Sequence, residues 1–589
     1  MVSDNRLNCL RKEGTMKILI AAINSKYIHA NLAIYSLKSY ADRALVQCSA
    51  ISELPKIETA EYTINQPQAR VMADIFRKAP DILFLSCYIW NRNEIENLAA
   101  DIGKVMPGVD IWLGGPEVSF DAEEVLERLH AVKGVIRGEG EKAFAGIVRA
   151  YCGGSSLNDA LAEIPDLTFR EASGRIAVTG ESGRIDFDTV PFAYKELDSF
   201  SNRIIYYESS RGCPFRCSYC LSSVDKKLKF RSVERVKPEL QFFLDRNVPQ
   251  VKFIDRTFNC SHEHAGEIWR YIRENDNGIT NFHFEIAADL MTEEEIELLG
   301  TMRPGQVQLE IGVQSTNEKT LKEINRPMDF GRVCEVVSAI RAVNNIHIHL
   351  DLIAGLPFED IRSFRSSFND IFTLRPHQLQ LGFLKVLKGS PIDRKSENYG
   401  LRSTDAPPYE VLSTNWISYE ELMGLKGVEE MVEVYYNSGQ FIKSVELLLG
   451  AFDDAFGFFE ALADWYREHG LDMINLSRNQ RYENLLEFGR AYAGGGELTD
   501  ALIYDFYSRE NVKSRPEFFG QDTVEKEYSK EFYRLEAEEH NKLSSRQCLE
   551  ADVRLLRRLT HIEKLGSRYY LFDYTQRDPM TNNARVVEL

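Results

Sequence analysis

Short apolar runs alternate with amphipathic stretches along the first 152 residues of the chain. Runs of strand length occupy 17–23, 45–51, 81–86, 110–115 and 134–138, and the intervening stretch 92–106 carries apolar side chains at three- and four-residue intervals. This alternation predicts an α/β fold, with a doubly wound, flavodoxin-like sheet over residues 16–152. Ligands of such sheets bind beyond the carboxyl ends of the strands, so we expect binding loops at 24–31, 86–91, 114–119 and 137–141.

The composition of the chain changes after residue 152. Residues 153–200 are rich in Gly, Ser and Asp and predict a linker with a small hairpin. Residues 201–400 hold a second strand–helix series, with strands expected at 203–210, 251–258, 281–288, 306–315, 347–357 and 378–386. Six such units predict a partial (β/α)6 TIM-type barrel with its active site at the carboxyl-terminal mouth of the strands. Residues 405–589 predict a mostly α domain, with long helices at 419–438 and 445–470 and a closing hairpin.

Composition and charge narrow the class of protein. The net charge of −18 over 589 residues argues against nucleic-acid binding, which requires clustered Lys and Arg. No apolar run reaches the roughly 18 residues of a membrane span, and no secretory signal is present, so we expect a cytoplasmic protein. Met16 begins the first strand directly, and we expect it to be the true start, with residues 1–15 forming a disordered leader.

Three cysteines lie close together directly after the expected strand 203–210. Cys213, Cys217 and Cys220 have the spacing C-x3-C-x2-C. Three thiolates in one loop can ligate three irons of a cubane iron–sulfur cluster and leave the fourth iron open. A zinc knuckle is the alternative, but it needs a fourth ligand, and the next Cys or His residues are Cys260 and His262.

The cysteine motif, with aromatic Tyr219 before its third cysteine, resembles the signature of the radical S-adenosylmethionine (SAM) superfamily. The resemblance implies a [4Fe–4S] cluster whose open iron binds SAM, and reductive cleavage of SAM to a 5′-deoxyadenosyl radical. It also implies SAM contacts: the amino group at Asp255, the ribose at a polar strand end, and adenine beside the fifth strand. The residues implied at this SAM site are Tyr219, Asp255, Glu310, Gln314, Ser315, Gly355 and Leu356.

The four N-terminal loops resemble those of the cobalamin-binding domain found in many radical SAM enzymes. The implied cobalamin contacts are Ser25, Tyr27, His29, Ser86, Tyr88, Trp90, Asn91, Gly114, Gly115, Pro116, Glu117, Gly138, Glu139 and Gly140. The D-x-H-x-x-G signature that supplies a cobalt ligand is absent, so His29 is either a substitute ligand or a hydrogen-bonded loop residue. A flavodoxin-like domain that binds a nucleotide or no ligand is the alternative.

These resemblances together imply a cobalamin-dependent radical SAM methyltransferase that acts on an unactivated carbon. The alternatives are a cobalamin-assisted cyclisation or rearrangement, and a cobalamin- or metal-sensing binding protein. RNA methylthiolation would bring a second cysteine triad, whereas the N-terminal cysteines are isolated. We expect a small-molecule or peptide substrate, a low-potential electron donor such as flavodoxin or ferredoxin, and activity under anaerobic conditions. The C-terminal region resembles an uncharacterised extension of some cobalamin radical SAM proteins.

Overall fold

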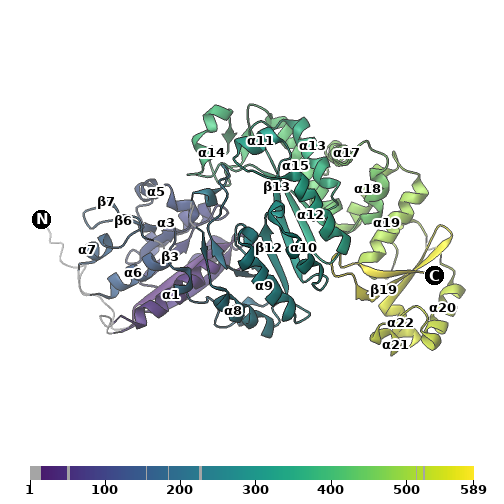
Figure 1. The fold of residues 1–589 in the computed structure, drawn as a ribbon, viewed down its shortest axis with the longest axis horizontal. Coiled ribbons are helices and arrows are strands. Elements are labelled where there is room, and N and C mark those ends of the chain that lie inside the picture. Colours follow the sequence, from purple (N-terminus) through teal and green to yellow (C-terminus); the bar gives the residue numbers. More distant parts are fainter. Residues whose placement is uncertain are drawn as a thin grey trace. The chain divides into compact units, whose positions relative to one another are not determined.

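The computed structural model describes residues 15–48, 53–153, 156–183, 185–224, 228–512, 514–521 and 524–589. The chain forms two compact units, and each is described by itself (Figure 1). The first holds the residues up to Phe284 together with Lys385–Ser396 and Ser403–Glu410. The second holds Glu285–Leu384, Glu397–Arg402 and Val411–Leu589. Apart from Thr15, the predicted leader lies outside the described residues.

A seven-stranded sheet forms the N-terminal domain, in the order β2-β1-β3-β4-β5-β6-β7. The first five strands in this order are parallel, as in a flavodoxin-like fold, and β6 and β7 extend the sheet in antiparallel fashion. The strands are β1 (Lys17–Asn24), β2 (Lys56–Thr63), β3 (Ile82–Ser86), β4 (Asp110–Gly114), β5 (Val132–Ile136), β6 (Leu167–Arg170) and β7 (Ile176–Val178).

Helices pack on both faces of this sheet. Ile18 and Ile20 of β1 face one core with α1 and α6, and Leu19 and Ala21 face the other with α2, α3 and α5. Because alternate residues of a strand point to opposite faces, an unbroken apolar run buries both sides. The helices are α1 (Leu32–Val46), α2 (Gln68–Lys78), α3 (Arg92–Val105), α4 (Pro116–Ser119), α5 (Ala122–Arg128), α6 (Glu141–Cys152) and α7 (Leu157–Ala162).

One N-terminal strand was wrongly predicted. Residues 45 and 46 end helix α1, residues 49–52 lie outside the described ranges, and the strand that pairs with β1 is β2, at Lys56–Thr63. The sequence KIETAEYT alternates apolar and polar residues and lies at the sheet edge, so its hydrophobicity is weaker than that of the central strands. The expected hairpin near residue 170 forms, as β6 and β7, and it belongs to the sheet rather than to a free linker.

The first unit also contains the start of the barrel series. Strands β8 (Ile205–Tyr207), β11 (Gln250–Phe253) and β12 (Asn281–Ile286) are parallel neighbours in that order. A short antiparallel ribbon of β9 (Ser210–Arg211) and β10 (Lys229–Phe230) brackets the cysteine loop. The connecting helices are α8 (Val233–Asp245) and α9 (His262–Glu274).

The second unit continues the series with β13 (Val307–Gln314), β14 (His347–Ala354) and β15 (Gln378–Phe383), again parallel neighbours. Odd-numbered residues of β13 are buried and even-numbered ones are half-exposed, so the sheet has one apolar and one polar face. The helices are α10 (Glu293–Gly300), α11 (Glu318–Glu323), α12 (Phe330–Val343) and α13 (Ile361–Phe372). Thr292 and Glu295 form a capping box at the start of α10.

The C-terminal region is mostly helical and ends in the three-stranded sheet β18 (Thr560–Leu565), β19 (Arg568–Arg577) and β20 (Ala584–Glu588). The expected helix 445–470 is two helices, α16 and α17, because the chain turns at residues 450–454 and Asp454 caps the second helix. The helices are α15 (Tyr419–Met431), α16 (Ile442–Leu449), α17 (Ala455–Glu468), α18 (Arg478–Gly489), α19 (Gly495–Arg509), α20 (Lys526–Glu539), α21 (Arg546–Leu549) and α22 (Val553–Leu559). In the described part of the chain, no helix has the length and apolar character to cross a bilayer.

Candidate functional site

The cysteine loop leaves the short strand β9 through Gly212, whose φ of +90° is a conformation that favours glycine. None of the three cysteines Cys213, Cys217 and Cys220 forms a disulfide, and Cys217 is buried while the other two are half-buried. The amide of Cys220 donates to the carbonyl of Cys217 at 3.2 Å, which folds the second half of the loop into a turn. Three cysteines outside any disulfide on one short loop fit the three-thiolate ligand set of a [4Fe–4S] cluster.

A fourth cysteine lies near this loop. Burial, with smaller contributions from Cys213 and Asp255, raises the pKa of the Cys260 thiol to about 11. The Sγ atom of Cys213 lies 3.5 Å from the hydroxyl of Thr257, in the same segment as Cys260. Cys260 is therefore a protonated thiol at neutral pH beside the cysteine loop.

Asp255 anchors the strand end that leads into the cysteine loop. Its carboxylate is 1% exposed and accepts bonds from the amide of Ser209 at 3.0 Å, the hydroxyl of Ser209 at 2.7 Å and the hydroxyl of Ser210 at 2.6 Å. Burial raises its pKa and these hydrogen bonds oppose the shift. The structure therefore gives Asp255 a role in holding the loop, and its contact with SAM stays a prediction.

His264 completes this buried network. Its Nε2 lies 3.0 Å from the hydroxyl of Ser209, and its ring packs against Phe230 and Phe258. Burial lowers the pKa of His264 to about 4, so the imidazole is neutral at physiological pH. Hydrogen bonds that join Asp255 to Ser209 and Ser210, and Ser209 to the neutral imidazole of His264, therefore support the cysteine loop.

Ion pairs join the base of the cysteine loop to the N-terminal domain within the first unit. Arg211 lies 2.6 Å from Glu141, 2.9 Å from Glu208 and 3.4 Å from Glu139. Lys229 lies 2.7 Å from Glu139. Burial raises the pKa of Glu208, whereas for Glu141 the pull of Arg211 outweighs burial and lowers the pKa. Glu139, a predicted cobalamin contact, therefore has two cationic partners on the cysteine-loop ribbon.

The two loops after β1 and β3 meet where the strand order reverses. Asn91 is fully buried, and its side-chain amide donates to the carbonyls of Ile23 at 2.8 Å and Ser86 at 3.1 Å. The indole of Trp90 donates to Ile23 as well, at 3.1 Å, and stacks on Tyr88 with ring centroids 4.4 Å apart. Trp90 is 40% exposed, so this pair offers a flat aromatic surface at the crevice where ligands of such sheets bind.

The other two predicted cobalamin loops, 114–119 and 137–141, each contain a glycine with positive φ. Gly115 has φ +122°, and a Cβ there would lie 2.3 Å from the carbonyl oxygen of Cys87. Gly138 has φ +67° and no heavy atom within 4 Å of a Cβ position, and its amide donates to the hydroxyl of Ser119 at 3.2 Å. The missing Cβ of Gly115 lets its loop pack against the Cys87 backbone, and Gly138 leaves open space at its turn. We call the loops 114–119 and 137–141 the glycine cradle, and their contact with cobalamin stays a prediction.

Other predicted cobalamin contacts differ in their surroundings. Tyr27 is 66% exposed, whereas Glu117 is buried and bonded inside the protein. The Nδ1 atom of His29 lies 2.6 Å from the hydroxyl of Tyr206, and burial, aided by Lys26, lowers the pKa of the imidazole. The ring of His29 is therefore hydrogen-bonded, as one of the two sequence alternatives expected, and cobalt ligation by it stays a prediction.

In the second unit, a buried carboxyl group supports the predicted ribose-binding strand end. Gln314 ends β13 with φ +72°, and the hydroxyl of the fully buried Ser315 donates to Glu359 at 2.6 Å. Ser367 donates to the same oxygen at 3.2 Å, and burial raises the pKa of Glu359 to about 7. Sequence reasoning missed Glu359, whose only signal is its place two residues after Pro357 in the loop that follows β14.

A second group lies on the polar face of β13 and β14, and the predicted site residues included Glu310 of this group but neither His349 nor Asp351. Glu310, directly opposite His349 in the register, forms with His349 and Asp351 a cluster whose potential ligand atoms all lie within 4.8 Å of one another. His349 Nε2 and an Asp351 oxygen are 3.1 Å apart. The polar alternation of HIHLD was a usable signal, because residues 347, 349 and 351 must share one face of a strand.

The remaining predicted SAM residues are close-packed. Gly355 has φ +87°, and a Cβ there would meet Val411 at 2.7 Å. Leu356 is fully buried, so it has its backbone rather than its side chain to offer a ligand. Tyr219 is half-buried on the cysteine loop.

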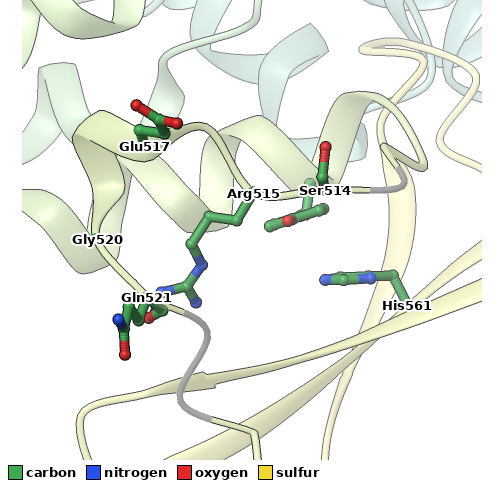
Figure 2. Close-up of a pocket in the computed structure, with 7 residues that line it drawn as sticks. Ser514, Arg515, Glu517, Gly520, Gln521 and His561 are labelled. Carbon is green, nitrogen blue, oxygen red and sulfur yellow. Dashed lines mark hydrogen bonds between the residues drawn. The ribbon is translucent and has the colours of Figure 1, made fainter.

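A separate cavity of about 560 Å³ lies in the C-terminal region (Figure 2). Glu563, 1% exposed, accepts bonds from the guanidinium of Arg515 and from Nε2 of His561, the latter at 2.8 Å. His561, which reaches from β18 toward the segment carrying Arg515, stacks on Tyr507 with centroids 3.8 Å apart. The cavity is lined by Tyr507, Ser514, Arg515, Glu517, Gly520, Gln521 and His561.

Comparisons with known proteins agree with this arrangement. The B12 binding domain matches residues 18–148, the Radical SAM superfamily matches 207–371, and a protein family of unknown function, DUF4080, matches 397–587. The cobalamin-dependent radical SAM methyltransferase TokK of Streptomyces tokunonensis is 27% identical over 56% of this chain and 51% of its own length. The 2-(S-pantetheinyl)-carbapenam-3-carboxylate methyltransferase of Streptantibioticus cattleyicolor is 26% identical over 61% of this chain and 57% of its own.

Among solved structures, the radical SAM methyltransferase TsrM of Kitasatospora setae, with cobalamin and a [4Fe–4S] cluster bound, aligns with a TM-score of 0.54. It is 15% identical and covers 67% of this chain and 79% of its own. At that identity the likeness shows the fold. The chain spans between half and three fifths of the length of the two curated relatives.

The fold and the cysteine loop define a protein with an N-terminal cobalamin-binding domain followed by a radical SAM domain. The chain carries both of these domains, and its C-terminal region matches DUF4080. Its cofactors are a [4Fe–4S] cluster, SAM and cobalamin, which the thiol loop and the glycine cradle fit.

Proposed function

We propose that this protein is a cobalamin-dependent radical SAM methyltransferase that acts on an unactivated carbon of a small-molecule or peptide substrate. One observation carries the proposal: the cysteine loop and the cobalamin loops belong to one compact unit, tied together by Arg211 and Lys229. Hydrogen abstraction and methyl delivery must reach the same substrate carbon, so a fixed spacing between the two loops favours this chemistry. The curated relatives that are named methyltransferases support the same conclusion.

When bound, the cluster and SAM supply a 5′-deoxyadenosyl radical, and cobalamin carries the methyl group. The protein's own residues hold and orient these groups. Cys213, Cys217 and Cys220 are the proposed cluster ligands, and the Asp255 network keeps the first of them at the end of its strand. In the second unit, Glu359 holds Ser315 at the proposed ribose site.

The proposal is tested on protein purified without oxygen and supplied with cobalamin, SAM and a low-potential donor such as flavodoxin or ferredoxin. Methyl transfer to carbon consumes two SAM molecules, one leaving as S-adenosylhomocysteine and one as 5′-deoxyadenosine. Comparable amounts of both products support methyl transfer. Deoxyadenosine alone identifies a cyclisation or rearrangement, and formation of neither with candidate substrates and a reduced cluster favours the binding-protein alternative.

A further inference from the structure

A buried ionic network lies behind the cobalamin loop 114–119 in the first unit. Its centre is Arg92, 5% exposed, which begins α3. The guanidinium lies 2.9 Å from Glu96, 3.0 Å from Glu117 and 2.8 Å from Asp121. One cation does not balance three carboxylates, of which Glu117 is buried and the other two are half-buried, so further cations must complete the network.

One completing cation comes from the chain that follows the barrel strands, and the other comes from the end of α5. Lys388 reaches Asp121 at 2.6 Å, and Arg128 pairs with Glu96. Three carboxylates thus meet three cations. Burial raises the pKa of Asp121, but its bonds to Lys388 and Arg92 outweigh this and leave the pKa lowered.

Tyr409 joins the same network from residues 403–410. Its hydroxyl donates to Glu117 and lies 3.2 Å from the guanidinium of Arg92. The side chain of Tyr409 is buried. The backbone carbonyl of Tyr409 accepts a bond from the amide of Val386 at 3.0 Å, which fixes Tyr409 to the segment that carries Lys388. Gly389, with φ +82°, lies so close to Phe120 that a Cβ would be 2.4 Å from the ring.

Glu117 connects this network to the cobalamin cradle. It lies two residues after Gly115 in the short helix α4, and its carbonyl also accepts a bond from Arg92 at 3.0 Å. Helix α4 is also bonded to Gly115, because the hydroxyl of Ser119 at its end donates to the Gly115 carbonyl at 2.8 Å. Since four residues make too short a helix to be stable alone, its conformation depends on these outside contacts.

We propose that Tyr409 and Lys388 are positioning residues that hold the loop 114–119 in the conformation that cobalamin binds. The proposal rests on the cobalamin site of the proposed function and adds that chain beyond the barrel determines the affinity of that site. Glu117 then acts from behind the loop, through Tyr409 and Arg92, rather than by contact with the cofactor.

The test compares the dissociation constant of hydroxocobalamin for the full-length protein and for Tyr409→Phe, by equilibrium dialysis under anaerobic conditions. We expect the constant to rise about tenfold, because the variant removes a hydrogen bond to a buried charged group and keeps the ring. Hydrogen exchange of the amides 114–119 should quicken in the same variant. Tyr62→Phe is the matched control, since its hydroxyl also donates to a carboxylate, Asp74, at 2.7 Å in the same domain.

Unchanged cobalamin affinity in Tyr409→Phe, even with a lower melting temperature, would overturn the positioning role and leave a packing role. If that variant does not fold, Lys388→Met is measured in its place, with the same expected weakening and the same overturning result. Failure of the wild-type protein to bind hydroxocobalamin would instead overturn the cobalamin site itself. An equal loss of affinity in Tyr62→Phe would also overturn the proposal, because the effect would then not be specific to the loop.

Discussion

The buried carboxyl of Glu359 should make the stability of its surroundings depend on pH in the neutral range. Burial raises its pKa from 4.5 to about 7, so the folded protein disfavours the ionised form. Stability is therefore greatest below pH 4.5 and is lost as the pH rises toward and through 7. At about 1.4 kcal/mol per pH unit, the difference between 4.5 and 7 corresponds to about 3–4 kcal/mol, which solvent does not screen because the side chain is 1% exposed.

Replacing Glu359 with Gln should remove this dependence. The amide oxygen can still accept from Ser315 and Ser367, and no charge is buried at any pH. We expect Glu359→Gln to match the wild type near pH 4 and to exceed it by about 3 kcal/mol at pH 8 in the local opening free energy. Ser315 at the proposed SAM site should then be held equally well at both pH values.

Hydrogen exchange of the amides 314–316, corrected for the intrinsic pH dependence of exchange, measures this local opening. Global unfolding is unsuitable, since a chain of two units need not unfold in one step. Glu318→Gln, the same change at an exposed position of the neighbouring helix α11, is the control and should leave the profile unchanged. An equal slope against pH in wild type and Glu359→Gln would refute the reasoning.

Three further outcomes are expected. Cys217→Ala should abolish cluster assembly and SAM cleavage, as measured by iron, sulfide and deoxyadenosine content; full deoxyadenosine production would show that Cys217 is not a ligand. Gly115→Ala should weaken cobalamin binding at least tenfold because of the clash with the Cys87 carbonyl, and binding as tight as wild type would contradict the cradle. Glu563→Gln should destabilise the C-terminal region by about 3 kcal/mol in thermal unfolding, since it leaves the buried Arg515 without its anion. Glu525→Gln, which breaks an exposed ion pair with Lys564, is the control for this variant. Equal losses of stability in the two variants would show that burial does not set the cost of losing the Arg515 partner.

The sequence by itself determined the fold class and the cysteine loop. Strands β1, β3, β4 and β5 are central and apolar on both faces, so their signal was strong, and the thiol spacing is local along the chain. The edge strand β2 carried a weak alternating pattern and was missed, and the turn between α16 and α17 interrupted a pattern that read as one helix. These errors fall where local preference and tertiary context disagree.

Only the tertiary structure decided which side chains support the site. Glu359 lies 44 residues from Ser315, and Tyr409 lies 292 residues from Glu117, so no periodicity or spacing could pair them. Buried polar groups find partners by their place in space, because each must be satisfied wherever the chain brings a donor or acceptor. The sequence therefore determined which chemistry the chain can hold, and the packing decided which residues hold it in place.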